Sequence, residues 1–265
     1  MKDIAMVVPV LNRFDMFTEM METVDYPVQP IVIDQWRNNR GVSWAWNEGM
    51  RRAKAMGYQH CLIANDDLKF RPESLERLSR TMEVTGAALV SPNQIRNSKV
   101  FDEDRSSWAT EGIRAGADFF CFMVDIDQIV DNAGWFDENF FPAYFEDNDM
   151  HRRMILSGLK SYIDTDCPVF HEGSMTQKFD KKNPNVDGDR FVSIKNYYMN
   201  KWGGPPGTET YDKPFGNHQL TIRDWNGSMV LDGFDYSPSQ DILDSIPSLC
   251  YDIRGTFDRH DYEVI

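Results

Sequence analysis

The chain has 265 residues, of which 41% are hydrophobic and 26% charged, and its formal net charge is −14. This composition fits one large globular domain or a domain with an appendage. The acidity argues against a protein that coats nucleic acid with clustered Lys and Arg, although a local basic patch could still reach a nucleic-acid acceptor. No stretch approaches the ~18–20 apolar residues of a membrane span. The apolar run near the N-terminus ends at Asn12 and Arg13 without a small-residue cleavage site, so it predicts a β-strand rather than a signal peptide.

The first half of the chain alternates short apolar runs with segments whose apolar residues recur at helical spacing. The runs are rich in β-branched residues, which is typical of strands buried on both faces. We expect strands at 4–10, 30–34, 59–64 and 87–91, and helices at 13–24, 43–56 and 72–85. Strands separated by helices of this length predict an α/β fold with a mostly parallel, Rossmann-like central sheet flanked by helices.

The second half is less regular. We expect a strand at 119–124, helices at 127–132, 147–156 and 191–202, and two short strands at 161–163 and 168–170. The polar segment 178–189 predicts a mobile loop, and GGPPG ends the last helix. From His218 onward acidic residues mix with isolated aromatics. This tail is compatible both with packing on the domain and with formation of a homo-oligomer.

An acidic run, Asn65-Asp66-Asp67, directly follows the strand expected at 59–64. Its simplest interpretation is a solvated loop or a helix cap, but the next helix starts too far along the chain for Asp67 to cap it. Ligands of open α/β sheets bind at the carboxyl ends of the strands. Mg²⁺ and Mn²⁺ prefer oxygen ligands, and Mg²⁺ is usually shared between one or two carboxylates and substrate phosphates. The run therefore predicts a metal–diphosphate site.

Two further positions could contribute to such a site. His171 follows a short apolar run; alone it fits a structural histidine, but its neutral imidazole could be a second metal ligand. Glu146-Asp147 opens a helix, where acids are favoured by the helix dipole. The functional alternative is a general base that accepts a proton from an attacking hydroxyl. Asp147 and Asp149 lie about 200° apart on a helix, so they cannot both face the site.

Together these residues resemble those of glycosyltransferase family 2 enzymes with the GT-A fold, especially the rhamnosyl- and galactofuranosyl-type members. The resemblance covers about residues 3–175 and rests on the order and spacing of VVPVLNR, IVIDQ, NNRGVSWAWNEGM, LIANDDLKF, GWFDENFFPAYFEDNDMHRRMILSG and VFHEGS. It implies a nucleotide-sugar-binding and catalytic core at 1–175 and a C-terminal extension at 176–265.

The resemblance also implies roles for individual residues. The metal motif of the family falls on Asn65-Asp66-Asp67, which assigns Mn²⁺ or Mg²⁺ to Asp67 and leaves open whether Asp66 shares it. His171 would complete the metal shell, and Asp147 of the pair Glu146-Asp147 would be the catalytic base. Trp135 and Asp137 would lie in the acceptor and sugar region. The residues expected at the nucleotide are Pro9, Val10, Arg13, Asp34, Asn39, Gly41, Asn47 and Asp66.

The expected activity is an inverting, metal-dependent transfer of a sugar from a UDP-, dTDP- or GDP-linked donor to an acceptor hydroxyl. A GT-A-like nucleotidyltransferase is one alternative, although PVLNRFD lacks the Gly-rich phosphate loop of those enzymes. A non-catalytic carbohydrate-binding protein is another. A glycan, a lipid-linked sugar, a protein side chain or a modified nucleic-acid base would each be a compatible acceptor. Four widely spaced cysteines without CxxC predict free thiols and a cytoplasmic protein, in the host cytoplasm if the protein is viral.

Overall fold

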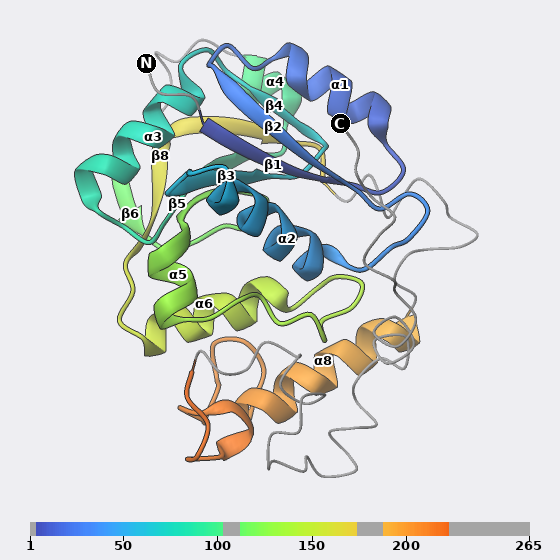
Figure 1. The fold of residues 1–265 in the computed structure, drawn as a ribbon, viewed down its shortest axis with the longest axis vertical. Coiled ribbons are helices and arrows are strands. Elements are labelled where there is room, and N and C mark those ends of the chain that lie inside the picture. Colours follow the sequence, from blue (N-terminus) through green and yellow to red (C-terminus); the bar gives the residue numbers. More distant parts are fainter. Residues whose placement is uncertain (1–3, 103–111, 174–187, 223–265) are drawn as a thin grey trace.

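The computed structural model describes residues 4–102, 112–173 and 188–222 (Figure 1). Its helices are α1 (Phe14–Glu22), α2 (Val42–Ala55), α3 (Ser74–Thr85), α4 (Ser98–Asp102), α5 (Ile126–Asn132), α6 (Glu146–Leu156) and α8 (Gly188–Trp202), with a 3-10 turn η2 at Pro214–Gly216. Its strands are β1 (Ile4–Val10), β2 (Val28–Asp34), β3 (His60–Ala64), β4 (Leu68–Phe70), β5 (Leu89–Ile95), β6 (Ile113–Ala115), β7 (Cys121–Asp125) and β8 (Ser161–His171). The predicted α/β fold is confirmed.

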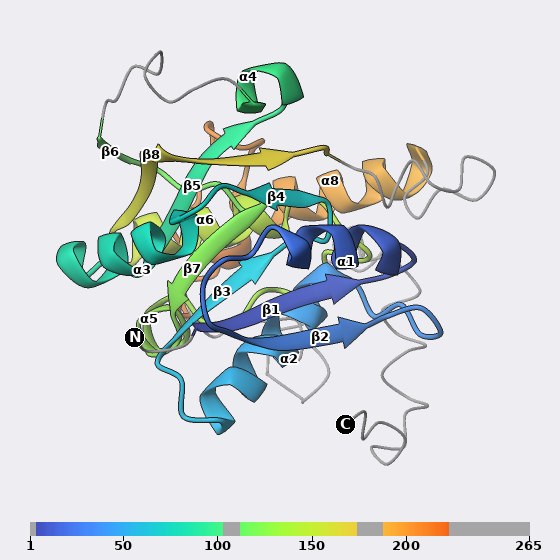
Figure 2. The ribbon, with the colours of Figure 1, turned by 90° about the horizontal axis from the view of Figure 1, so that it is seen from above.

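The strands form one sheet in the order β2-β1-β3-β7-β5-β8-β4, and β6 pairs with β8 outside this path. Five strands, β2, β1, β3, β5 and β8, run in one direction, whereas β7 runs antiparallel to both β3 and β5, and β4 and β6 run antiparallel to β8. Parallel neighbours need a connection that crosses back over the sheet. The described part of the connection from β5 to β7 holds only α4 and β6, so β7 starts at the edge where β5 ends (Figure 2).

The two short strands expected at 161–163 and 168–170 are parts of one longer strand, β8. Its pairing with β5 shifts in register between Pro92 and Asn93, so β8 is irregular where the two segments meet. The end of β8 also pairs with β4, a strand that the sequence patterns did not predict, with Leu68 opposite His171. This short antiparallel pairing carries the acidic run at 65–67 next to the end of β8.

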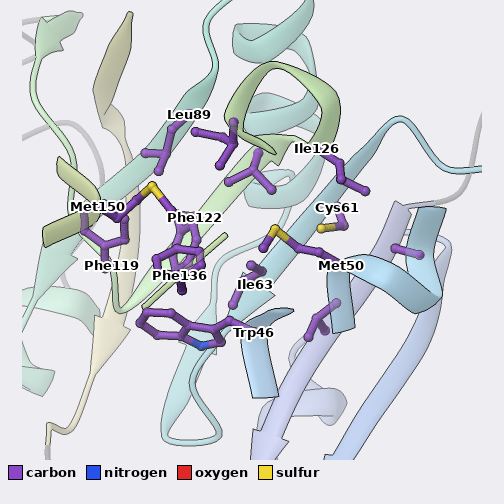
Figure 3. Close-up of a cluster of buried hydrophobic side chains, with 14 of the residues drawn as sticks. Trp46, Met50, Cys61, Ile63, Leu89, Phe119, Phe122, Ile126, Phe136 and Met150 are labelled. Carbon is purple, nitrogen blue, oxygen red and sulfur yellow. The ribbon is translucent and has the colours of Figure 1, made fainter. Parts of the chain in front are cut away.

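Helices cover both faces of the sheet, as the alternation of buried side chains along each strand requires. On one face, α2, α5 and α6 pack on strand residues such as Val7, Ile63 and Phe122, and the ring of Trp46 packs edge to face on that of Phe122 (Figure 3). On the other face, α1 and α3 pack on the alternate residues, among them Met6 and Leu62. Cys61, Cys121 and Cys167 are buried free thiols, while Cys250 lies outside the described residues.

The described part of the predicted extension is α8 and the turns after it, and α8 lies beyond α6 in Figure 1. Its buried residues Ile194, Tyr197, Tyr198 and Trp202 form a third cluster with Phe140 and Phe141 of the preceding core. The predicted loop lies mostly, and the acidic tail largely, outside the described residues, so their structures stay predictions. Within the described ranges, no helix is long and apolar enough to cross a membrane.

Candidate active site

A cavity of about 340 Å³ opens at the edge of the sheet where β1 and β3 end and β7 begins. Its walls include Pro9 near the end of β1, the acidic run after β3, His171 at the end of β8, and the segment 142–147 at the start of α6. Asp67, Asp147 and His171, which the sequence placed in one site, therefore share one cavity.

The pair Asp67–His171 is built by the β4–β8 pairing. His171 Nε2 lies 3.1 Å from Asp67 Oδ1, and the backbone N–H of Gly173 donates to Asp67 Oδ2 at 3.1 Å. The imidazole stacks on the ring of Phe120 with centroids 5.0 Å apart, and its Nδ1 lies within hydrogen-bonding distance of Gln94 Nε2. These contacts hold both side chains almost fully buried, with their polar atoms at the cavity wall.

The pair fits a divalent cation that is shared with a substrate. Within the described ranges, no group of three or more His, Cys, Asp and Glu side chains is arranged to hold a metal. An imidazole nitrogen and a carboxylate oxygen nevertheless suit Mn²⁺, and Mg²⁺ is commonly held by one or two carboxylates together with substrate phosphates rather than by a cage of protein ligands. Asp67 and His171 are the residues that would hold it.

Asp66 is the second acid of the run and also lines the cavity. Burial raises the pKa of its carboxyl group to about 7, and the neighbouring charge of Asp67 adds to the effect. Its Oδ2 atom is buried and has no hydrogen-bond partner in the part of the chain that the structure describes. A buried polar atom in this state is costly unless a ligand satisfies it.

Glu146 and Asp147 open α6 and line the same cavity as the acidic run at 65–67. Burial raises the pKa of both carboxyl groups; the charge of Asp147 adds to the effect at Glu146, and that of Asp118 adds to it at Asp147. Glu146 Oε2 has no hydrogen-bond partner among the described residues. Perturbed carboxyl groups in a cleft are candidates for acid–base chemistry.

The cavity wall is strongly acidic. Among the described residues that line it, Arg96 is the one Arg or Lys, against the carboxylates of Asp66, Asp67, Asp118, Glu146 and Asp147. A diphosphate would be repelled by such a wall unless a cation accompanied it, because like charges at short range in a poorly solvated site interact strongly. The electrostatics of the cavity thus agree with the ligand chemistry of Asp67 and His171.

The residues expected at the nucleotide fall into two groups. Pro9, Asn39 and Asp66 line the cavity. Asn39 also shapes its rim, because its Oδ1 accepts the N–H of Gly41 at 3.0 Å. Gly41 has a φ of +86°, and a Cβ there would lie 3.0 Å from the Phe141 ring, so this tight turn into α2 favours glycine.

The others do not line the cavity. Val10 is buried in the core, Arg13 forms an ion pair with Asp15 at 2.7 Å, and Asp34 is exposed at the end of β2, where it accepts from the N–H of Trp36. Asn47 is fully buried; its Nδ2 donates to the carbonyl oxygen of Phe136, and its Oδ1 accepts from the N–H of Phe136. Its role in the structure is to attach the segment after α5 to α2.

Trp135 and Asp137, expected near the acceptor, also lie away from the cavity wall. Trp135 is partly buried against the core, with the Arg51 guanidinium 4.6 Å from its ring centre. Asp137 is fully buried, and its Oδ2 accepts from Lys201 Nζ and from the Tyr197 hydroxyl, each at 2.7 Å. A carboxylate that is engaged in this way cannot face an acceptor, so this placement does not support the expected role.

The model of the family described as Glycosyl transferase family 2 matches residues 7–147, which is more than half of the chain. The chain belongs to glycosyl transferase family 2. The matched region begins in β1 and ends at Asp147, so it contains nearly all of the cavity wall described above. The predicted glycosyltransferase is confirmed at the level of the family. No curated protein sequence matches the chain significantly.

Solved structures show where this family 2 chain stands in fold space. A crystal structure of S. aureus TarS matches with a TM-score of 0.50 at 13% identity, covering 75% of this chain and 43% of TarS. GalNAc-T7 with UDP, GalNAc and Mn²⁺ matches with a TM-score of 0.50 at 11% identity, covering 75% of this chain and 50% of GalNAc-T7. This chain thus spans half or less of these two neighbours, and the likeness concerns the GT-A fold.

Several cavity residues of the family 2 domain were not predicted from the sequence. Asp118 was missed because the sequence patterns predicted no direction for the strand at 119–124, and its place in the cavity wall depends on β7 running antiparallel to β3 and β5. Gln94 and Arg96 were missed because β5 was expected to end at residue 91. No local pattern distinguishes the remaining ones, among them Gln35, Trp46 and Tyr144.

Proposed function

We propose that this family 2 protein transfers a sugar from a nucleoside-diphosphate donor to an acceptor hydroxyl, with inversion at the anomeric carbon and with Mn²⁺ or Mg²⁺ as cofactor. The observation that carries the proposal is that one cavity joins the pair Asp67–His171 to the carboxylates of Glu146 and Asp147. The first pair offers ligands for a metal–diphosphate, and the second offers a proton acceptor.

The donor would lie with its nucleoside against Pro9 and Asn39 and its diphosphate toward Asp67 and His171. A divalent cation, when bound, would supply Lewis-acid neutralisation of the leaving diphosphate, which is worth several kcal/mol of transition-state stabilisation. The chain's own contribution is to orient the diphosphate through residues that the β4–β8 pairing already holds in place, so little reorganisation is needed.

Asp147 is the proposed base. Its carboxylate would take the proton of the acceptor hydroxyl while that oxygen forms a bond to the anomeric carbon, and the bond from this carbon to the diphosphate breaks with its electron pair on the leaving oxygen. A raised pKa makes Asp147 a better proton acceptor than an ordinary aspartate. With Asp147 acting as the base and the acceptor oxygen as the nucleophile, the reaction is a single displacement, hence inversion.

The structural neighbours support UDP-sugars as the first donors to test, since GalNAc-T7 was crystallised with UDP, GalNAc and Mn²⁺. dTDP- and GDP-sugars come next, and the rhamnosyl or galactofuranosyl specificity remains a prediction. A cytoplasmic location is likewise proposed, in keeping with the buried free thiols of Cys61, Cys121 and Cys167.

The test is a thermal shift of the full chain with UDP-, dTDP- and GDP-sugars, with and without Mn²⁺. A ligand at 100 times its Kd stabilises the native state by ~2.7 kcal/mol, which raises Tm by roughly 5–10 °C for a chain of this size. We expect one donor class to produce this shift only with Mn²⁺. Asp67→Ala should abolish it, whereas Glu83→Ala, which removes an exposed carboxylate on α3, should leave it intact.

Release of nucleoside diphosphate separates the alternatives. A slow, Mn²⁺-dependent hydrolysis of the bound donor supports a transferase. Binding without hydrolysis would favour a non-catalytic carbohydrate-binding protein, and release of pyrophosphate from a nucleoside triphosphate and a sugar phosphate would favour a nucleotidyltransferase. Equal donor affinity in the wild type and Asp67→Ala would contradict the proposed metal site.

A further inference from the structure

Two exposed aromatic rings meet at the mouth of the cavity. Tyr144 lines the cavity three residues before Asp147, and 37% of its surface is exposed. Its ring meets that of Phe191 edge to face, with centroids 5.5 Å apart, and Phe191 is 40% exposed. We call these two rings the aromatic shelf. One ring comes from the core and the other from α8, so the extension supplies part of the surface beside the catalytic carboxylates.

The shelf is held in place by packing rather than by local preference. Tyr144 and Phe145 have φ values of 82° and 69°, in the left-handed backbone region that residues other than glycine rarely adopt. Phe145 packs against Phe191 and against Tyr198, with ring centroids 5.6 Å and 5.5 Å apart. Non-glycine residues keep such a backbone only where the surroundings enforce it, and these positions cluster at ligand sites. Here the turn places Tyr144 outward, next to the start of α6.

The chemistry around the shelf restricts its occupant. The cavity wall beside it is acidic, which disfavours a phosphodiester and therefore a nucleic-acid acceptor. The shelf consists of two rings, with the exposed side chain of Val192 beside Phe191, and this small surface suits one flat group rather than a helix or a strand. A sugar ring presents an apolar C–H face that can lie on an aromatic ring and hydroxyl groups at its edge that stay polar.

We propose that the aromatic shelf binds the acceptor, and that the acceptor is an uncharged saccharide. This inference rests on the proposed function, because it takes Asp147 as the base for the hydroxyl that the bound sugar presents. Tyr144 belongs to the same cavity wall as Glu146 and Asp147, so a sugar ring lying on the shelf would extend toward these carboxylates. The extension then selects the acceptor, while the sheet edge binds the donor.

The test measures binding of simple saccharides without a donor. Saturation-transfer NMR on the full chain with methyl glycosides of glucose, galactose, rhamnose and N-acetylglucosamine should show contact to the ring C–H protons of at least one of them. Phe191→Ala should raise the Kd for that glycoside about tenfold, which is the loss of affinity expected for one aromatic contact. Phe191→Tyr keeps the ring and should bind like the wild type. Ile155→Ala removes a side chain on α6 that is 57% exposed and lies away from the cavity, and should change nothing.

The outcomes of this test are separable from those of the donor screen. Absence of binding for the whole panel, or equal binding by wild type and Phe191→Ala, would overturn the saccharide shelf even if donor and Mn²⁺ stabilise the protein. A second outcome would overturn it in favour of a protein acceptor. In that outcome an unglycosylated peptide containing serine and threonine shows a saturation-transfer signal that is lost in Phe191→Ala, and no glycoside binds. If a glycoside binds but no donor produces a thermal shift, the result would support the shelf and would contradict only the proposed donor site.

Discussion

Helix α6 presents acidic side chains to two regions that differ in whether a cation lies beside each acid. Asp147 faces the cavity, whereas Asp149, on the other side of the helix, is fully buried among cations of α6 and α8. Lys201 Nζ lies 2.6 Å from Asp149 Oδ1 and 2.7 Å from Asp137 Oδ2. Arg153 also pairs with Asp149 at 2.6 Å. In this buried network each acid has a cation beside it.

The cavity shows the contrary arrangement. Glu146 Oε2 and Asp66 Oδ2 are buried and have no hydrogen-bond partner among the described residues, and the pKa values of both carboxyl groups are raised by burial. Uncompensated acids destabilise a fold, whereas paired ones hold elements together. The difference suggests that the network fixes α8 on the core, and that the cavity is arranged for a cationic and hydrogen-bonding ligand. Three substitutions test it, in order of expected effect.

The largest effect is expected for Asp147→Asn. Loss of a general base typically lowers turnover by ~10²–10⁴-fold, and the amide keeps the shape of the side chain. We expect donor hydrolysis, measured as release of nucleoside diphosphate, to fall by this factor, while the donor-induced thermal shift stays near that of the wild type. Wild-type turnover in this variant would show that the base has been assigned wrongly.

Lys201→Met should cause the largest loss of stability. Removing one partner of a buried ion pair leaves uncompensated charge and costs about 3–5 kcal/mol. For a chain of this size we expect Tm to fall by roughly 10 °C, measured by circular dichroism or calorimetry. Lys195→Met is the matched control, because Lys195 lies on the same helix and is exposed.

The double variant Asp137→Asn with Lys201→Met sharpens the result. It removes the opposing charge as well, so part of the lost stability should return. If Lys201→Met and Lys195→Met were equally stable, the network would not be what attaches α8 to the core. If the double variant lost more stability than the two single variants lose together, that result would also contradict the role of the network in attaching α8 to the core.

Glu146→Gln should have the smallest effect, and a pH-dependent one. The folded-state pKa of Glu146 is raised above its usual 4.5 by burial and by Asp147, so the folded protein holds this proton more tightly than the unfolded one. Stability therefore falls as pH rises from the unfolded-state pKa toward the raised folded-state pKa, so at neutral pH the carboxyl group contributes less stability than an uncharged amide would. The variant should melt a few degrees above the wild type at pH 7.5, and the gap should shrink toward pH 4. A gap that did not change with pH, or one shared by Glu83→Gln on the exposed face of α3, would contradict this account.

Much of the fold follows from local patterns. The apolar runs and the helical spacing in the first half placed β1, α2, β3 and α3 to within two residues, because burial against a sheet imposes periodicity on the sequence. The candidate site was predictable where a strand or helix boundary marked it, as at Asp67, Glu146 and His171. It was not predictable at Asp118, whose position depends on the direction of β7. Nor was it predictable at Asp137, whose carboxylate accepts a hydrogen bond from Lys201, 64 residues further along the chain.

The amino-acid sequence by itself determined most of the longer strands and helices and that acids stand at the ends of some of them, since these features depend on neighbours a few residues apart. Only the tertiary structure decided which acids face the cavity and which are buried beside Lys201 and Arg153. That choice depends on the β4–β8 pairing and on the docking of α8, and both join side chains that are distant in sequence. Burial has a different consequence in each place. An acid next to a buried cation stabilises the fold, whereas an acid in the cavity without a cation beside it can bind a ligand.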